Sequence, residues 1–435
     1  MADKYTVSSL FKFIKKSTDP FHAVAEIKNT LTENGYTELN ECEPWTLENG
    51  GKYFVSRNLS SIIAFRVPED TFKGFMMVAS HSDSPCFKIK ENAELKNQPY
   101  VRINTERYGG MLCATWLDRP LAVAGKVVVR DGNCLKSLLY SSEQPILLIP
   151  NVAIHMNRSA NTGFEYKANV DTIPLWGSGE CGSFREYIAS DMGISADSIV
   201  STDLFTVNPA EGVLWGANGE FISAPRLDDL ECVYASMQGF LASEEKETVP
   251  VFAVMDNEEV GSTTKQGADS TFLSDIITRI CESFGYSSSV QSALISNSFL
   301  VSADNAHAVH PNHPEYSDPT SKVYMNGGVV IKYNANQKYT TDSVSDAIFS
   351  TICAQNGVPV QRYTNRADMA GGSTLGNISN THVSVNTVDI GLAQLAMHSS
   401  FETAGSEDIT HMINALTAFY SSKITRISDG DYKIN

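Results

Sequence analysis

Four short apolar runs, each followed by acidic residues or histidine, restrict the fold of this chain more than any other feature. They cover residues 75–79, 249–255, 299–301 and 382–390. Short apolar runs bounded by polar turns are typical of strands buried on both faces of a mainly parallel sheet. Helical spacing of apolar residues separates them, as in 227–241 and 272–280. We therefore expect an α/β fold, with a mixed, largely parallel sheet and helices on both faces.

Metal-competent side chains cluster at the points where these runs end. In open α/β sheets ligands bind at the carboxyl ends of the strands, so the four ends are expected to converge on one site. A two-metal hydrolase needs histidines, carboxylates, one bridging carboxylate and a further carboxylate that moves protons. The candidates in chain order are His81, Asp83, Asp228, Glu258, Glu259, Asp304 and His398.

Each candidate taken alone also has a structural interpretation. Adjacent Glu258 and Glu259 are compatible with a solvated turn, and Asp228 with a helix N-terminus that favours acids through its dipole. Asp304 is compatible with a turn, and His398 with a buried histidine. Only the joint pattern at the ends of the four runs favours a metal site.

The pattern changes between about residues 90 and 212. Short strands with turn signals such as Asp131-Gly132 are expected at 101–103, 121–130 and 135–150. Alternation of helix and strand resumes only near Phe184. We therefore expect a β-rich insertion over 91–212 that splits an α/β catalytic domain into 1–90 and 213–435.

Charge and cysteine usage exclude several classes of protein. The chain carries 33 Lys and Arg against 50 Asp and Glu, a net charge of −17. This charge disfavours binding to nucleic acid and to anionic membrane surfaces. The eight cysteines are scattered with no C-x-x-C motif, as in proteins of a reducing compartment. No stretch approaches the roughly 20 apolar residues of a membrane helix, so we expect a soluble cytoplasmic protein without nucleic-acid or membrane partners.

Motifs spread over nearly the whole chain resemble the aspartyl aminopeptidase family, the self-assembling zinc aminopeptidases that include the yeast vacuolar enzyme and bacterial relatives. DNEEVGS together with AHAVHPN is a highly specific combination. The motifs are Ser80-His81-Ser82-Asp83-Ser84-Pro85, Tyr108-Gly109-Gly110, WLDRPL (116–121), Ala153-Ile154-His155, APRLD (224–228), DNEEVGS (256–262), SADNAHAVHPN (302–312) and LAMHS (395–399).

The resemblance implies a zinc exopeptidase-like catalytic domain interrupted by a β-rich dimerisation domain. It also implies two zinc ions per subunit, for which cobalt or manganese are possible substitutes. The implied roles are Asp228 as the bridge, His81 and Asp304 at one ion, Glu259 and His398 at the other, Asp83 orienting His81, and Glu258 as general base.

The implied reaction removes the N-terminal residue of a peptide through a metal-bridged hydroxide, with Glu258 accepting its proton and returning it to the leaving amine. His155 is expected to reach the active site of a partner subunit and to stabilise the oxyanion. Lys332 matches a family lysine that pairs with an acidic substrate side chain. The expected partners are therefore peptides and further copies of the chain, as dimers that assemble into a dodecamer.

Two segments leave the preferred N-terminal residue of the substrate undetermined. Ser400-Phe401 and Met369-Ala370-Gly371 depart from the family pattern near the expected pocket for the first residue, so acidic and neutral residues both remain candidates. Pro311 and Pro314 argue against a continuous helix carrying His307, His310 and His313. The resemblance assigns the ligand to Asp304 instead, so we interpret these three histidines as structural residues or as residues that surround the ligands. Residues 371–374 lack a P-loop lysine and are expected to form a tight turn lining the pocket.

Two other functions remain compatible with the sequence. One is a two-metal hydrolase of a non-peptide substrate, such as a deacylase. The other is a non-catalytic assembly protein of the same fold, which predicts loss of a ligand or of Glu258. None of these residues is missing.

Overall fold

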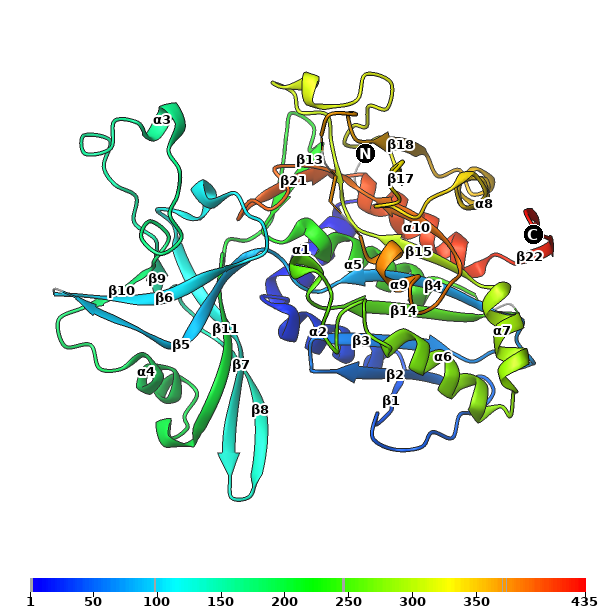
Figure 1. The fold of residues 1–435 in the computed structure, drawn as a ribbon, viewed down its shortest axis with the longest axis horizontal. Helices are drawn as coiled ribbons and strands as arrows, with labels where there is room; N and C mark the ends of the chain where they lie inside the picture. Colours follow the sequence, from blue (N-terminus) through cyan, green and yellow to red (C-terminus); the bar gives the residue numbers. More distant parts are fainter. Residues whose placement is uncertain (1–2, 98, 245–246, 370, 373) are drawn as a thin grey trace.

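A nine-stranded mixed sheet organises the larger part of the molecule (Figure 1). The computed structural model describes residues 3–97, 99–244, 247–369, 371–372 and 374–435. In spatial order the strands are β1 (Thr37–Glu38), β2 (Lys52–Arg57), β3 (Ser61–Arg66), β14 (Val249–Met255), β4 (Phe75–His81), β15 (Phe299–Ala303), β19 (Asn386–Gly391), β17 (Val329–Tyr333) and β18 (Val360–Thr364).

The four apolar runs form the four central strands of this sheet. β14, β4, β15 and β19 are adjacent and parallel, and β14, β4 and β15 are buried along their whole length. The sheet is antiparallel where β2 joins β3, where β3 joins β14 and where β17 joins β19. This arrangement confirms the predicted α/β fold with a largely parallel sheet. The prediction was wrong for 382–385, because β19 begins only at Asn386.

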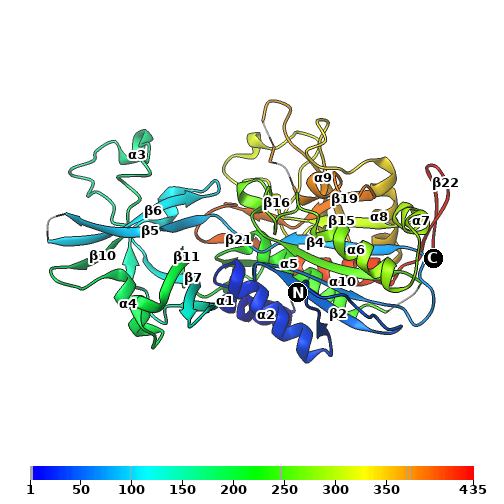
Figure 2. The same cartoon turned by 60° about the horizontal axis from the view of Figure 1, so that its bottom comes forward.

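Helices cover both faces of the sheet (Figures 1 and 2). Along β4, Met76 and Val78 belong to the apolar cluster of one face and Phe75 and Met77 to that of the other. One face packs against α1 (Lys4–Lys16), α2 (Pro20–Glu33), α5 (Leu227–Ala242), α8 (Ser343–Gln355) and α10 (Asp408–Ser421). The other packs against α6 (Phe272–Ser283), α7 (Ser288–Ser296) and α9 (Leu375–Ser379).

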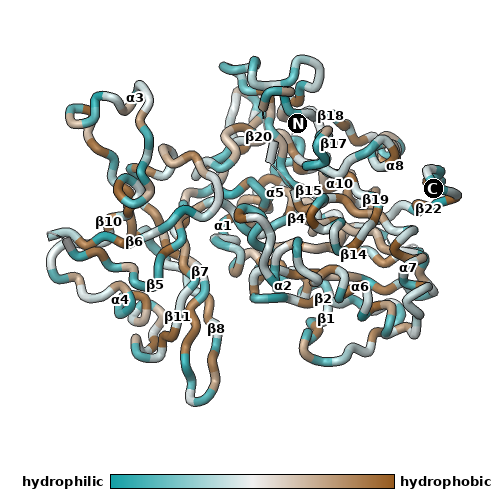
Figure 3. Tube along the Cα trace, viewed as in Figure 1, coloured by the Kyte–Doolittle hydropathy of each residue, from teal (hydrophilic) through white to brown (hydrophobic). Residues whose placement is uncertain are grey.

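Burial on both faces explains the continuous apolar runs. Figure 3 shows apolar residues along central strands such as β14 and β19. Fully burying a large apolar side chain contributes about 1.5–3 kcal/mol, so a strand covered on both sides is stabilised at every position. The polar side chains of β4 and β15 lie near their carboxyl ends (Ser80, His81 and Ser302), whereas β19 also buries Asp389.

Residues 17–19 separate the first two helices. α1 ends at Lys16, so Asp19 does not belong to it. Asp19 instead caps α2, where its carboxylate accepts hydrogen bonds from the amides of Phe21 and His22. Pro20 occupies the first turn of α2, where its missing N–H costs nothing.

A second body of β-structure lies beside the large sheet, on the left in Figure 1. Its sheet closes because β11 pairs with both β5 and β7. The strands are, in spatial order, β11 (Ile199–Val207), β5 (Cys86–Asn97), β6 (Tyr100–Tyr108), β10 (Leu175–Ser178), β9 (Leu147–Leu148), β7 (Pro120–Asp131) and β8 (Cys134–Ser141). Helix α4 (Phe184–Asp191) packs on this barrel. The short helix α3 (Ala160–Gly163) lies on a loop that extends from it.

A small sheet joins the return from the barrel to the C-terminal half of the chain. Its spatial order is β12 (Val213–Trp215), β13 (Phe221–Ala224), β21 (Glu402–Gly405), β20 (Ala393–Leu395) and β16 (Ala306–His307). The hairpin β22 (Ile424–Ser428) and β23 (Asp431–Ile434) ends the described fold. Within the described residues, no helix combines the length and apolar content needed to cross a membrane.

Candidate metal centre

The candidate ligands come from the carboxyl ends of adjacent strands. His81 ends β4, and Asp304 follows β15 directly. Glu258 and Glu259 form a 3₁₀ turn (Glu258–Val260) just beyond β14. Parallel strands end at the same edge of a sheet, and for that reason these side chains meet.

Two further ligands reach the same edge from other elements. Asp228 lies in the first turn of α5, where its backbone is not helical (φ −82°, ψ 106°). His398 follows β20 and has a left-handed backbone with φ 65°. A non-glycine residue in this region is strained and persists only where its surroundings hold it.

Asp228 occupies the middle of the cluster. Its Oδ1 lies 3.5 Å from His81 Nε2, and its Oδ2 lies 3.4 Å from His398 Nε2. The two oxygens of one carboxylate therefore face two different histidines. His81 Nε2 also lies 4.0 Å from Asp304 Oδ1, and His398 Nε2 lies 3.4 Å from Glu259 Oε1. The cluster thus has two halves that share Asp228.

Asp83 supports the cluster mainly through the main chain. The Nδ1 atom of His81 lies 3.0 Å from the carbonyl oxygen of Asp83 and 3.5 Å from its carboxylate. The carboxylate itself accepts hydrogen bonds from the backbone amides of Glu258 at 3.1 Å and Glu259 at 3.2 Å. The contact between the Asp83 carbonyl and His81 supports the predicted orientation of His81 by Asp83. The carboxylate of Asp83 additionally holds the turn that contains Glu258 and Glu259.

Burial of so many carboxylates perturbs their proton affinities. Burial, reinforced by the charges of Asp304, Asp83 and Asp228 and opposed by His81, raises the pKa of Glu258 to about 8. Burial also raises the pKa of Glu259, together with repulsion from Asp228. At Asp228 the facing imidazoles of His398 and His81 outweigh burial and lower the pKa. The protein supplies too few cations here to balance its acids.

The residues present fit a divalent metal. Asp228 Oδ1 and Glu259 Oε1 are buried and accept no hydrogen bond within the described part of the chain. Histidine nitrogens and carboxylate oxygens are suitable zinc donors. Three groups of side chains bring such atoms together: His81 with Asp228, Asp229 and Asp304; His81 with Glu258 and Glu259; and Asp228 with Glu259 and His398.

A cavity of about 390 Å³ opens above these ligands. Its wall away from the candidate ligands includes Lys332, His307, Tyr339 and Tyr363. Lys332 on β17 is buried, and its Nζ donates to the carbonyl of Asp304 at 2.7 Å and lies 3.3 Å from the carboxylate. The ammonium that was predicted to meet an acidic substrate therefore lines the cavity while already contacting a candidate ligand.

The remaining predicted residues lie elsewhere. His155 is exposed on the loop that carries α3 and does not line this cavity. His310 and His313 are exposed, while His307 lines the cavity. Gly372 and Thr374 also line it, but Ser373 lies outside the described residues, as does Ala370, so the predicted turn over 371–374 is described only in part.

Sequence reasoning missed two residues that contact this cluster. Glu402, at the start of β21, accepts hydrogen bonds from the backbone amides of Asp228 and His398. Tyr108, at the end of β6, donates its hydroxyl to Asp83 at 2.7 Å. Tyr108 stands beside two glycines in a recognisable motif, which was a usable signal. Glu402 has none, because only the small sheet carries it back to the cluster.

Comparison with known families agrees with this geometry. A family model described as "Aminopeptidase I zinc metalloprotease (M18)" matches residues 13–420. The chain belongs to the M18 aminopeptidase family. It is accordingly a zinc-dependent aminopeptidase, a hydrolase, as its sequence motifs predicted.

Curated relatives of this M18 chain extend over nearly its whole length. It is 46% identical over 422 residues to a "Probable M18 family aminopeptidase 2" of Clostridium acetobutylicum, covering 95% of this chain and 98% of the relative. A protein of the same description from Pseudomonas savastanoi pv. phaseolicola is 40% identical over 424 residues, covering 95% and 98%.

Solved structures share the fold of this M18 chain. The chain in "Cryo-EM structure of the Ape4 and Nbr1 complex" superposes with a TM-score of 0.93 at 33% identity, covering 96% of this chain and 86% of that one. "Structure of S. cerevesiae mApe1 dodecamer" gives a TM-score of 0.84 at 26% identity and covers 96% of each chain.

Proposed function

We propose that this M18 aminopeptidase is a dinuclear zinc enzyme that removes acidic or neutral N-terminal residues from peptides. The observation that supports two ions is the position of Asp228, whose oxygens face His81 at 3.5 Å and His398 at 3.4 Å. His81 and Asp304 would hold one ion with Asp228, and Glu259 and His398 would hold the other. Cobalt or manganese could substitute, because these donors accept them too.

The chain's own groups supply the proton transfers. Bound zinc contributes Lewis acidity, which polarises a carbonyl and lowers the pKa of water. Glu258 borders the cavity beside the ligands and acts as general base, taking a proton from the attacking water and giving it to the leaving amine. Asp83 keeps Glu258 in place through the backbone amide.

The active site is proposed to be completed by a second subunit. His155 is exposed on a loop beyond the barrel, where it can meet another molecule and stabilise the oxyanion there. A dodecamer built from dimers is proposed by analogy with the dodecamer of S. cerevisiae mApe1. The barrel, predicted at 91–212, would then be the dimerisation domain.

We place the enzyme in the cytoplasm. All eight cysteines are free, as expected in a reducing compartment. The net charge of −17 disfavours nucleic acid and anionic membranes as partners.

A substrate panel tests the proposed function. Purified protein is loaded with zinc, cobalt or manganese and assayed with the p-nitroanilides of Asp, Glu, Leu and Met. Turnover that is lost after chelation and restored by metal is expected. No turnover of any substrate by protein shown to contain metal would refute the aminopeptidase assignment and leave the deacylase or assembly alternatives.

A pair of glutamine variants tests the roles of the adjacent glutamates. Glu258→Gln should reduce kcat by at least about a thousandfold, since both proton transfers are lost, while two zinc ions remain bound. Glu259→Gln, the matched control one residue away, should lose zinc as well as activity. Zinc is counted by atomic absorption after gel filtration. Equal zinc loss in both variants would contradict the assignment of Glu258 as base.

A further inference from the structure

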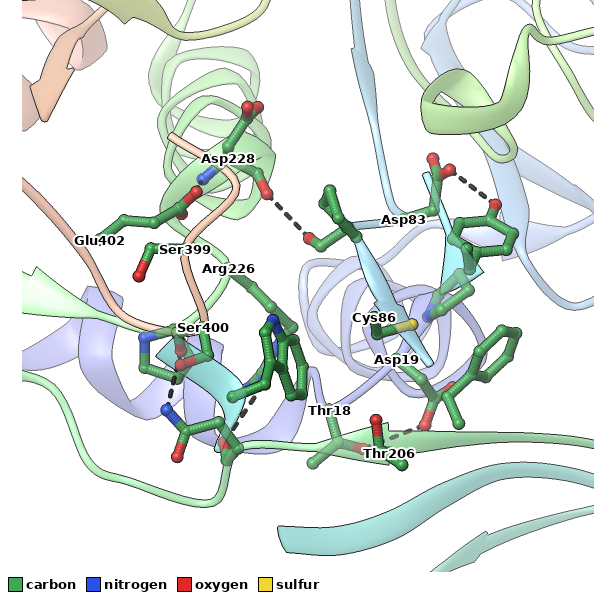
Figure 4. A pocket seen from close by; sticks show the side chains of 18 of the residues that line it. Thr18, Asp19, Asp83, Cys86, Thr206, Arg226, Asp228, Ser399, Ser400 and Glu402 are labelled. Atoms are coloured by element: carbon green, nitrogen blue, oxygen red, sulfur yellow. Dashed lines mark hydrogen bonds between the residues drawn. The ribbon is translucent and has the colours of Figure 1, made fainter. Parts of the chain in front are cut away.

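Glu402 connects the two halves of the metal cluster through the main chain. Its side chain is only 2% exposed. Its Oε2 accepts a hydrogen bond from the backbone amide of Asp228 at 3.0 Å, and its Oε1 accepts one from the backbone amide of His398 at 2.6 Å. Figure 4 shows the Glu402 carboxylate turned towards the main chain of Asp228. One buried carboxylate therefore fixes two candidate ligands that lie 170 residues apart in sequence.

The backbone at both contacts needs external support. His398 has φ 65° and Ala396 has φ 55°, so this segment holds a left-handed conformation without glycine. Asp228 departs from helical geometry at the start of α5. The carbonyls are held too: Ser84 donates to that of Asp228 at 2.8 Å, and Leu112 to that of His398 at 3.0 Å. Glu402 supplies the bond on the amide side of each ligand.

We propose that Glu402 is a positioning residue that sets the affinity of the ion held by His398, Glu259 and Asp228. This inference rests on the dinuclear site proposed above. Glu402 does not face the metal with a free oxygen, because both its oxygens accept backbone hydrogen bonds. It acts by holding the imidazole of His398 and the carboxylate of Asp228 at a separation that suits one ion. Groups that orient metal ligands typically change metal affinity by about 10–100-fold when they are removed.

The chain contains a matched control for the same chemistry. Asp408, the first residue of α10, is fully buried, and its two oxygens accept bonds from the backbone amides of Gly328 at 2.9 Å and Asn326 at 2.5 Å. Those amides precede β17 and belong to no candidate ligand. Glu402→Gln and Asp408→Asn therefore each remove one buried carboxylate that joins two amides. In each, the amide group of the new side chain can accept only one of the two bonds.

The test compares zinc binding in the wild type and the two variants. Zinc affinities are measured by competition with a chromophoric chelator, and thermal unfolding is followed in parallel. Both variants should unfold at lower temperature than the wild type. Only Glu402→Gln should bind one of its two zinc ions about 10–100-fold more weakly, with activity recovering as free zinc is raised. Asp408→Asn should keep both affinities. Cobalt spectra of the weakened ion should change in Glu402→Gln alone.

The outcomes separate this inference from the proposed function. A wild type that binds a single zinc ion would refute the dinuclear site. A wild type that binds two ions, with a Glu402→Gln isotherm that matches that of Asp408→Asn, would overturn the role of Glu402 alone. If Glu402→Gln does not fold, Glu402→Asp replaces it, because a shorter carboxylate cannot reach both amides. Failure of both variants to fold would show a purely structural role and would also overturn the inference.

Discussion

Lys332 illustrates how one side chain can serve two neighbours. It is buried on β17, and its ammonium contacts both the carbonyl and the carboxylate of Asp304. Burial opposes its charge, but the attraction of Asp304, together with weaker attraction from Tyr339, Asp389 and Cys232, raises the pKa of Lys332. The ammonium is thus available as a charge at the wall of the cavity. Its predicted pairing with an acidic substrate side chain would add a second partner on the cavity side.

Replacing Lys332 tests that pairing directly. Lys332→Gln should reduce kcat/KM for an Asp substrate at least about tenfold more than for a Leu substrate, because a charge pair is lost only with the former. Lys126→Gln is the control, since Lys126 is also buried and lies 3.4 Å from Asp203, away from the cavity. An equal fall in kcat/KM for both substrates would show that Lys332 pairs with Asp304 and not with the substrate.

At the scale of elements, strand β6 connects the barrel to the metal cluster. The hydroxyl of Tyr108 donates to Asp83, and the side-chain amide of Asn257 donates to Tyr108 at 2.9 Å. The ring of Tyr108 packs edge-on against Phe205 of β11. Since Asp83 holds the amides of Glu258 and Glu259, two hydrogen bonds in sequence, Tyr108 to Asp83 and Glu258 to Asp83, connect the barrel to the predicted base.

Removing one hydroxyl should reveal this connection. Tyr108→Phe keeps the ring contact but loses the hydrogen bond to Asp83. We expect kcat to fall roughly tenfold because Glu258 is misplaced, while KM and zinc content stay unchanged. Tyr140→Phe is the control, because Tyr140 donates in the same way to Asp191 at 2.9 Å, elsewhere in the barrel. The values of kcat and KM for the two variants are measured by steady-state kinetics. An equal fall in both would indicate a general effect of loosening the barrel.

At the scale of the whole molecule, the loop that carries α3 presents a stretch of exposed residues, 150–156. It extends away from the large sheet in Figure 1, and His155 on it is exposed. Val152, Ile154 and Met156 beside it are exposed by 47%, 49% and 81%. Apolar side chains clustered at an exposed site favour burial against another molecule, which fits the proposed dimer.

Complementation between two inactive variants tests whether His155 acts across subunits. His155→Ala and Glu258→Gln should each be nearly inactive alone. Co-refolded in equal amounts, they should recover about a quarter of wild-type activity, because half of the dimers are mixed and each mixed dimer has one complete site. No recovery, despite mixed dimers shown by mass spectrometry of differently tagged chains, would contradict a role in trans.

Much of the fold was predictable because it follows from local pattern. Apolar runs such as 249–255 are continuous only when both faces of a strand are covered, so the central sheet could be inferred from the sequence. The start of β19 could not, because Val383 and Val385 are apolar but lie in the turn after α9. An apolar residue indicates that a position is buried, but it does not tell whether that position lies in a strand or in a turn.

The residues of the candidate site divide in the same way. Those that follow strands, such as His81 and Asp304, were identifiable because topology brings strand ends together. Glu402 was not, because its partners are backbone amides, which every residue possesses. The support of Asp83 through its own carbonyl was equally invisible in the sequence.

The sequence by itself determined the family, the α/β class and the set of acids and histidines available to a metal. These features depend on side-chain chemistry and on the local periodicity of apolar residues, and both can be read directly from the sequence. Only the tertiary structure decided that Asp228 faces two histidines, that Lys332 contacts Asp304 and that Glu402 joins the main chains of two candidate ligands. The physical reason is that these relations depend on distances between segments far apart in the chain. Packing of the complete fold fixes such distances, and no local pattern encodes them.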